Sequence, residues 1–368
     1  MTLEGVPRTH VSIAGHRHGA FYTTGWLGFW LAAALTISLC AATGLSVLVQ
    51  AAIAALSAIV YFSIVRVARR VYGRQALIYY HHVLAFLAVA AVFAAVLGEP
   101  VLAYLDVTAC GLGLFTAVAR VGCLMVGCCH GQPARHGIPY GPEHERYGIP
   151  LYLVGVRLMP VQAIEAAGCL LLAIAGSAAV LAGAAAGTAL TIFLAGYAAL
   201  RFALEWLRGD LARPYALGLS EAQWTSLGLA LVVAALAATD VLPGGPTAIL
   251  PAVVLLVAAV ATVLGRVPRH RELLAPTHVR ELAHRLGGLE PSRPDHVITT
   301  VTSRGLQVSM GETRGYAHYT LSTDAPLDAG SDVRLARLVL WICRDESEPE
   351  LIPGGDGAIH VVTPRRLP

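Results

Sequence analysis

The segment ARVGCLMVGCCHGQP, residues 119–133, joins an apolar run to a loop rich in glycine and proline. It places one arginine, three cysteines and one histidine at the end of a stretch long enough to cross a membrane. Polar and ionisable groups are costly near a bilayer, and they are kept there mainly for function. The segment therefore marks an expected membrane boundary and a candidate site.

The composition of the chain is typical of a membrane protein. Of its 368 residues, 56% are hydrophobic and 13% are charged, and the mean hydropathy is +0.64. A spanning helix needs about 20 apolar residues. Windows of this kind lie at 26–44, 46–65, 79–97, 101–119, 161–184, 187–206, 223–240 and 247–265. The first two run together, and two spans fit their length better than one. We predict an all-α polytopic membrane protein with seven to eight transmembrane helices.

The two ends of the chain differ from this middle part. Residues 1–25 are largely polar and lack a cleavable signal pattern, so we expect the first span to remain as an anchor. Beyond residue 265 the charge rises; HVITTVTSRGLQVSM and AIHVVT have the pattern of strands, and SDVRLARLVLWI that of an amphipathic helix. We predict a polar N-terminal segment (1–25), a transmembrane domain (26–265) and a small soluble α/β C-terminal domain (266–368).

The cysteines do not form a disulfide scaffold, because their number is odd and three of them are bunched. For Cys123, Cys128 and Cys129 the favoured interpretation is close packing of small residues at a turn, followed by a polar role in a substrate site. A redox-active thiol is a further alternative. A metal site ranks low, because adjacent cysteines rarely reach one tetrahedral centre and no second CxxC pair exists. We expect no metal and no other cofactor.

Polar residues gather on one predicted membrane face, whereas the connections LGEP, AGAAAG and VLPGGP on the other face are short and nearly uncharged. The positive-inside rule explains Arg66, Arg69, Arg70 and Arg266. It does not explain Gln162, Glu165, Glu205 or the paired His81 and His82. Eight spans also place Ser220 and Gln223 on that face. This face is the predicted functional site.

The residue types on this face suit phospholipid chemistry. Arg120 and Arg201 are candidates to clamp a phosphate, because a guanidinium binds it through paired hydrogen bonds. Glu205 and Arg208 share a helix face with Arg201, so successive ion pairs along that face would orient one arginine for phosphate binding. His81 or His82 is a candidate proton acceptor for a thiol or hydroxyl nucleophile. Plain interfacial residues remain the alternative for the histidines and for any lone arginine.

Four segments in order resemble motifs of the prolipoprotein diacylglyceryl transferase family: ARVGCLMVGCCHGQP, RLMPVQAIEA (157–166), LRFALEWLRGD (200–210) and LGLSEAQWTSL (217–227). The resemblance covers roughly residues 20–240 and implies a bacterial inner-membrane enzyme. Such an enzyme moves the diacylglyceryl group of phosphatidylglycerol to the lipobox cysteine thiol of a lipoprotein precursor, and glycerol phosphate leaves. The resemblance implies that Arg120 and Arg201 hold the phosphate, with His81 or His82 near the family's essential histidine. The implied substrate-binding set is Arg120, Cys123, Cys128, Gly131, Gln162, Glu165, Arg201, Glu205 and Arg208.

The chain departs from the family pattern at several positions. Cys123 stands where the family has asparagine, Cys128 where it has an acidic residue, and Met159 where a histidine is common. HHVL replaces His-Gly-Gly-Leu. The chain thus looks like a divergent branch with cysteines in the signature, in which acceptor or donor can differ. The family's active face lies outside the cytoplasm, and we follow that orientation although Arg8, Arg17 and RVARR on this face favour the opposite one.

The sequence thus predicts a phospholipid-dependent transferase whose partners are phosphatidylglycerol, a lipoprotein precursor and membrane lipids. One alternative is a paralogue that transfers a lipid moiety to a different acceptor. Another is a non-catalytic lipid-binding membrane protein. Nucleic acid is not an expected partner, because the arginines are directed to the membrane.

Overall fold

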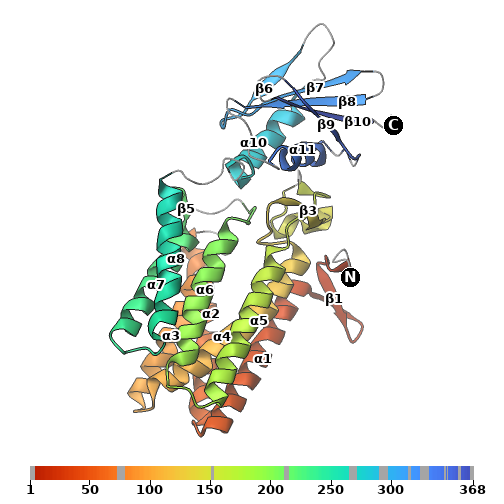
Figure 1. Cartoon of the computed structure of the whole chain (residues 1–368). Coiled ribbons are helices and arrows are strands. Elements are labelled where there is room, and N and C mark those ends of the chain that lie inside the picture. Colours follow the sequence, from red (N-terminus) through yellow and green to blue (C-terminus); the bar gives the residue numbers. More distant parts are fainter. Residues whose placement is uncertain are drawn as a thin grey trace.

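The computed structural model describes residues 5–72, 79–150, 153–210, 215–264, 272–289, 297–313, 316–323, 331–343, 345, 347–354 and 358–364. Within these residues, each predicted apolar window forms a helix of one bundle (Figure 1). The helices are α1 (Ala20–Thr43), α2 (Val47–Tyr72), α3 (Tyr79–Val96), α4 (Val101–Val126), α5 (Val161–Leu181), α6 (Thr188–Glu205), α7 (Glu221–Ala238) and α8 (Gly245–Val263).

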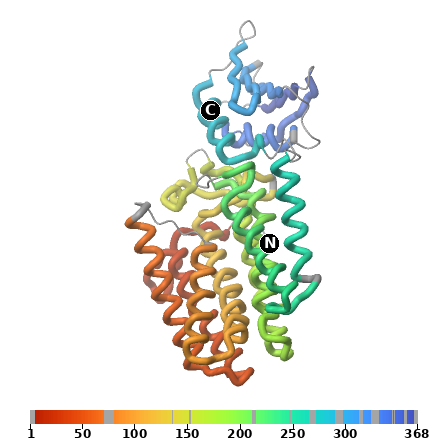
Figure 2. Tube along the Cα trace, turned by 90° about the vertical axis from the view of Figure 1, so that its left-hand side faces the viewer, coloured from red at the N-terminus to blue at the C-terminus, as the bar shows by residue number. Residues whose placement is uncertain are grey.

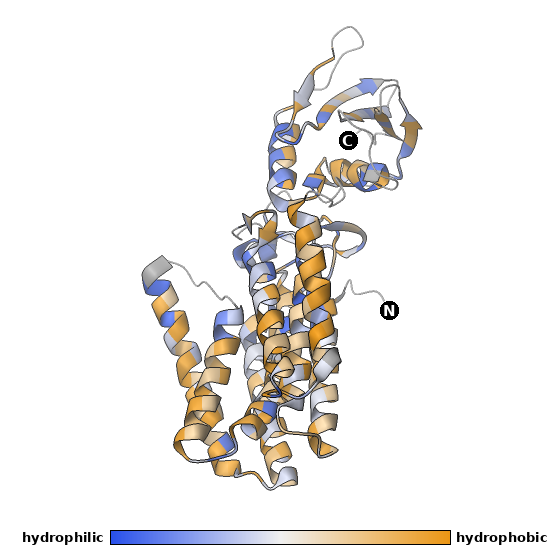
Figure 3. Ribbon diagram, turned by 60° about the vertical axis from the view of Figure 1, so that its left-hand side comes forward, coloured by the Kyte–Doolittle hydropathy of each residue, from blue (hydrophilic) through white to orange (hydrophobic). Residues whose placement is uncertain are grey.

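The bundle confirms the prediction of a polytopic helical membrane protein. Six of the described helices are long and apolar enough to cross a membrane, and α3 and α8 contain shorter apolar stretches. The first two windows are separate helices, as predicted. Gly44 ends α1 with a φ of +75° and donates its N–H to the Cys40 carbonyl, and α2 begins at Val47. Figure 3 shows that hydrophobic residues cover the helices along most of their length.

Helix α4 is the central element of the bundle. In its apolar window 72% of the residues are buried, against 11% in α2. Small residues permit this close packing: a Cβ at Gly111 would lie 2.5 Å from Thr36 of α1, and a Cβ at Gly113 would lie 3.0 Å from Ala173 of α5. The charged end of α4 is therefore enclosed by neighbouring helices.

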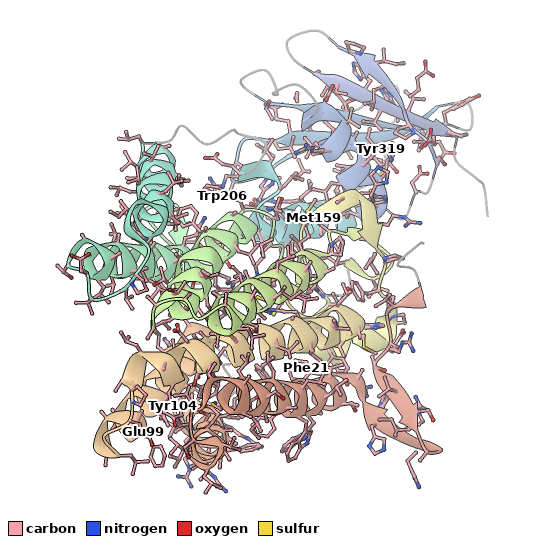
Figure 4. The ribbon with its side chains drawn as sticks, turned by 60° about the horizontal axis from the view of Figure 1, so that its bottom comes forward. Phe21, Glu99, Tyr104, Met159, Trp206 and Tyr319 are labelled. Carbon is pink, nitrogen blue, oxygen red and sulfur yellow. The ribbon has the colours of Figure 1, made fainter. Side chains whose placement is uncertain are left out.

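The two ends of the bundle differ in construction, as predicted. At one end the connections are short, and the hydroxyl of Tyr104 donates to Glu99 (3.4 Å) and accepts from the backbone N–H of Ser46 (3.0 Å). The other end carries long loops, and Figure 4 shows Met159 and Trp206 there, away from Glu99 and Tyr104. The functional face predicted from the sequence is this second end.

Residues 127–150 and 153–160, which we call the cap loop, cover this end of the bundle (Figure 1). They contain β3 (Pro133–Ile138) and the 3₁₀ helix η2 (Pro142–Tyr147). Carbonyl groups at the end of α4 accept hydrogen bonds from the cap loop and from the N-terminal segment. Tyr140 donates to Leu124 (2.9 Å), and the N–H of Arg8 donates to Met125 (2.8 Å).

A hairpin of β1 (His10–Ile13) and β2 (His16–Gly19) leads into α1 at the same end. The sequence analysis did not predict this hairpin, and it placed the start of the first span at residue 26. Helix α1 begins earlier, at Ala20, because Ala20 and Thr24 are buried against the end of α4.

The C-terminal region confirms the predicted mixture of strands and helices. It contains α10 (Pro276–Gly287), α11 (Ser331–Ile342) and an antiparallel sheet of order β6-β7-β8-β10-β9. The strands are β6 (Thr299–Val301), β7 (Gln307–Thr313), β8 (Tyr316–Ser322), β9 (Glu350–Pro353) and β10 (Ile359–Pro364). Along β8 the alternating residues Ala317, Tyr319 and Leu321 are buried, which is the period of a half-buried strand.

The C-terminal region packs directly on the cap loop (Figure 2). One apolar cluster contains Ile138, Tyr140 and Leu158 of the cap loop together with Leu335 and Val339 of α11. The proposed boundary at 265/266, with Arg266, lies outside the described residues and stays a prediction. The apolar cluster contains described residues from both sides of this boundary, so the C-terminal sheet and helices share a core with the cap loop.

Candidate active site

A buried ion pair joins the central helices at the cap end. Arg120 of α4 and Glu165 of α5 meet through two contacts, Nε to Oε2 at 2.9 Å and Nη2 to Oε1 at 3.0 Å. Tyr197 of α6 donates its hydroxyl to the same Oε1 at 2.8 Å. Arg120 and Glu165 are 7% and 1% exposed. A paired, charge-assisted contact of this kind fixes the orientation of the guanidinium.

The ion pairs continue along α6 and the loop that follows it. Arg201 Nη2 lies 2.6 Å from Glu205 Oε1, and Arg208 Nε lies 3.8 Å from the same oxygen. Arg208 also donates from Nε and Nη2 to the two carboxylate oxygens of Asp210, both at 2.9 Å. Three arginines and three carboxylates therefore alternate, and we call this set the Arg–Glu network: Arg120, Glu165, Arg201, Glu205, Arg208 and Asp210.

One buried donor in the Arg–Glu network has no acceptor among the described residues. Arg201 Nη1 is buried and makes no hydrogen bond within the described part of the chain; its nearest charged neighbour is Glu165 Oε2, at 4.0 Å. Arg208 is instead occupied by Asp210. A buried cationic donor of this kind gains most from an anion that brings its own oxygen acceptors.

The start of the cap loop is tied to two other segments. Gly131 donates its N–H to the Met159 carbonyl (3.0 Å), and Gly209 donates to the His130 carbonyl (2.9 Å). A Cβ at Gly131 would lie 2.5 Å from the Met159 oxygen, so a side chain does not fit at this position. Gln162, which is 1% exposed, donates Nε2 to the Cys128 carbonyl at 2.8 Å. Gly131 and Gln162 therefore hold the loop in place.

Three cysteine thiols, which we call the thiol cluster, come together where α4 ends. The Sγ atoms of Cys123, Cys128 and Cys129 all lie within 4.8 Å of one another. Arg120 Nη1 donates to the Cys123 sulfur at 3.9 Å. The adjacency of Cys128 and Cys129 made such a meeting unexpected. It occurs because Cys129 adopts a left-handed backbone conformation, with a φ of +57°.

The thiols of this cluster affect one another. Hydrogen bonds with the Cys123 and Cys128 thiols, together with the charges of Arg208 and Arg120, hold the pKa of Cys129 well below its usual range. The same contacts with Cys123 and Cys129 raise the pKa of Cys128. The two neighbouring thiols outside the helix thus have pKa values shifted in opposite directions. Burial lowers the pKa of the His130 imidazole.

The first turn of α3 places three consecutive side chains in different surroundings. Tyr80 is buried, with its hydroxyl 2.6 Å from that of Ser226 and its ring 5.7 Å from that of Tyr197. His82 is buried with its ring 5.2 Å from that of Tyr61. His81 is exposed, 3.9 Å from Glu221. The residue that packs on Tyr197, and so against the Arg–Glu network, is Tyr80.

Some residues of the site were not identified from the sequence. Tyr197 lies four residues before Arg201, so helical spacing places both on one face. Asp210 follows Arg208 by two residues and was quoted without being assigned a role. Ser220 and Gln223, expected on the polar face, form the capping box that begins α7.

These features define a class of protein: a polytopic membrane bundle with a buried, charge-balanced site at one end, under a tied loop. The chain belongs to the prolipoprotein diacylglyceryl transferase family, whose sequence model matches residues 11–239. That range contains the Arg–Glu network and the thiol cluster. A comparison with curated proteins finds no match. The chain is therefore a multi-pass membrane protein of a transferase family that serves lipoprotein biosynthesis.

Proposed function

We propose that the chain transfers the diacylglyceryl group of phosphatidylglycerol to the cysteine thiol of a lipoprotein precursor in the bacterial inner membrane. The observation that carries this proposal is Arg201, whose Nη1 is buried and without a hydrogen bond in the described residues while Nη2 is fixed by Glu205. A lipid phosphate in contact with Nη1 would complete the coordination of this arginine. Arg120 lies across the shared Glu165 and supplies a second positive charge.

The reaction follows from these charges. The thiolate sulfur attacks the diacylglycerol carbon that carries the phosphate ester, a C–S bond forms and the C–O bond breaks. The electron pair leaves on the phosphate oxygen. Fixed guanidinium groups stabilise that developing charge in a site without bulk water. The network also limits reorganisation, since Glu165 and Glu205 hold Arg120 and Arg201 before the lipid binds.

The other site residues have proposed supporting roles. Gly131 and Gln162 position the cap loop, Arg208 neutralises Glu205 and Asp210, and Cys123 and Cys128 line the acceptor side. His81 or His82 is the proposed acceptor of the thiol proton. Substituting each histidine separately by glutamine tests that assignment, since only the loss of the essential histidine should strongly lower the transfer rate.

The test of the function is transfer by the purified protein in detergent. The protein is incubated with phosphatidylglycerol labelled in its acyl chains and a peptide with a lipobox cysteine. We expect label on the peptide in thioether linkage, and a loss of about 10²–10³-fold in rate for Arg201→Gln, the size found when one preorganised donor to a developing charge is removed. Arg146→Gln is the matched control, because Arg146 lies on η2 over the ring of Tyr147 and outside the network.

Each outcome of this assay separates the candidates. Release of glycerol phosphate without label on the peptide would indicate a different acceptor. Lipid binding that needs Arg201, with no release of glycerol phosphate, would indicate a lipid-binding protein. Wild-type transfer by Arg201→Gln would contradict the proposed role of the Arg–Glu network.

A further inference from the structure

We infer that Cys123, Cys128 and Cys129 form a binding site for a thiophilic divalent cation, Zn²⁺ in the first place, which keeps one coordination position open for the acceptor thiol. The metal site stands on the thiol cluster alone. The role of the open position rests on the function proposed above. This inference departs from the expectation of no metal, which rested on the adjacency of Cys128 and Cys129 and on the lack of a second CxxC pair.

The spacing of the sulfur atoms suits a metal ion better than a disulfide. Zn–S bonds of about 2.3 Å in a tetrahedral site place the sulfurs roughly 3.8 Å apart. The three Sγ atoms already lie within 4.8 Å of one another, so each pair closes by about 1 Å at most. A disulfide needs an S–S distance of about 2.05 Å and joins only two of the three thiols. One cation satisfies all three.

The backbone around the cluster is built to hold this arrangement. Side chains of adjacent residues point apart in regular helices and strands. The positive φ of Cys129, next to Gly127 with a φ of +84°, turns the chain so that both thiols face the one from α4. Such a conformation is costly for a residue with a side chain and persists only where its surroundings fix it. Gln162 on the Cys128 carbonyl and Gly209 on the His130 carbonyl supply that restraint.

The charges near the cluster favour a metal thiolate. Binding of Zn²⁺ releases the three thiol protons and leaves a centre with one net negative charge. Arg120 Nη1 already donates to the Cys123 sulfur and would offset this charge. Soft thiolate ligands select zinc and its soft neighbours over Mg²⁺ or Ca²⁺.

The ligand count leaves room for a substrate. In the described part of the chain the group that meets the metal-ligand spacing comprises these three cysteines, one ligand fewer than a closed structural zinc site needs. A catalytic zinc site typically has three protein ligands and one exchangeable position. A thiol that enters this position gives its proton to the histidine proposed above as acceptor and binds as the thiolate, which is the nucleophilic form.

Arg120 connects this position to the phosphate site. Its Nη1 contacts the Cys123 sulfur, while its Nε and Nη2 hold Glu165, the carboxylate next to Arg201. A thiolate on the metal therefore lies beside the arginines proposed to hold the lipid phosphate. Its sulfur forms the C–S bond as the C–O bond breaks and the electron pair goes to the phosphate. The metal keeps its charge throughout and is not oxidised or reduced.

The first measurement is the metal content of the full-length protein, purified in detergent and loaded with Zn²⁺, followed by removal of loosely bound metal. We expect about one zinc per chain in the wild type. The variants Cys123→Ser and Cys129→Ser should lose it, whereas Cys110→Ser, also on α4 and buried, and Cys343→Ser in the C-terminal region should keep it. Equal zinc in all five proteins, or none in the wild type, would overturn the site.

The second measurement uses Co²⁺ in place of Zn²⁺, since its visible spectrum reports the ligands. We expect sulfur-to-cobalt charge-transfer bands that need Cys123 and Cys129. Adding a lipobox cysteine peptide should increase these bands, and the same peptide with serine should not. A spectrum that the cysteine peptide leaves unchanged would show a purely structural metal and would overturn the role of the open position.

The transfer assay separates failure of this inference from failure of the proposed function. Transfer that is unaffected by stripping the metal would overturn the inference and leave the transferase standing. A cobalt spectrum that responds to the thiol, in a protein that transfers no diacylglyceryl group, would keep the metal–thiol site and overturn the proposed function.

Discussion

Replacing Glu165 by glutamine tests whether the Arg–Glu network organises the site. The carboxylate receives two contacts from Arg120 and one from Tyr197, and it is the counter-charge nearest to Arg201 Nη1. Glutamine keeps the shape but removes the charge and one acceptor. Breaking a buried pair in this way costs about 3–5 kcal/mol. At about 2–4 °C for each kcal/mol in a domain of this size, the Tm should fall by about 6–20 °C.

The assay is thermal unfolding in detergent. Unfolding is monitored by the reaction of a fluorogenic maleimide with the thiols of Cys40, Cys110 and Cys169, which are buried in the folded protein. Glu221→Gln is the matched control, because Glu221 is half-exposed and its contact with His81 is worth about 0–1 kcal/mol at most. Phosphatidylglycerol should also stabilise Glu165→Gln more than the wild type, since its phosphate replaces the lost charge. A Tm shift no larger than that of Glu221→Gln, with no added effect of the lipid, would refute this reasoning.

Three further substitutions probe the loop, the far end of the bundle and the C-terminal region. Gly131→Ala pushes a Cβ against the Met159 carbonyl, and we expect a loss of about 1–3 kcal/mol in stability and a strong loss of transfer. Gly228→Ala, in open space on α7, should keep transfer unchanged and raise stability by up to about 1 kcal/mol. Asp106 accepts hydrogen bonds from N–H groups at the start of α6. The substitution Asp106→Asn should lower the free energy of unfolding by about 1–3 kcal/mol and leave transfer per folded molecule unchanged. Burial lowers the pKa of His278 from its ordinary 6.5, so the unfolded chain takes up the proton first. The stability that the neutral His278 contributes above about pH 6.5 should therefore be lost as the pH falls below that value. Hydrogen exchange of α10 at about pH 5 and about pH 7.5 measures the loss, and His278→Gln should remove the difference in protection between the two pH values.

The helices could be predicted because few backbone conformations are stable in lipid. Each uncharged apolar run has to satisfy its backbone internally, so its length alone assigns a spanning helix. Helix ends were harder. The window that ends at residue 119 continues as α4 to Val126, through Arg120 and Cys123, because neighbouring helices enclose these polar groups. Gly127, with its positive φ, is the residue that ends the helix.

The part of the candidate site that lies along a single helix could be predicted from the helical spacing of its residues. Arg201, Glu205 and Arg208 share a face by spacing alone. Pairing between helices depends on how each helix is rotated, which the sequence does not contain. The rotation of α3 directs Tyr80, rather than His81 or His82, towards Tyr197. The meeting of Cys128 and Cys129 with Cys123 depends on one backbone angle that is unusual for cysteine.

The Arg–Glu network also has a consequence for how the protein enters the membrane. Helices α4 and α5 carry one charge of the network each, and α6 carries two, Arg201 and Glu205. An unpaired charge in a spanning helix disfavours partition into lipid by up to about 2.5–3.5 kcal/mol. Arg120 is synthesised well before Glu165 and Arg201. We expect α4 to remain at the insertion machinery until α5 and α6 arrive, so that the three helices leave together. A force-sensing arrest sequence placed after each helix should record a weak pull at α4 and a strong one once α6 has emerged, and equal, independent pulls would contradict this order.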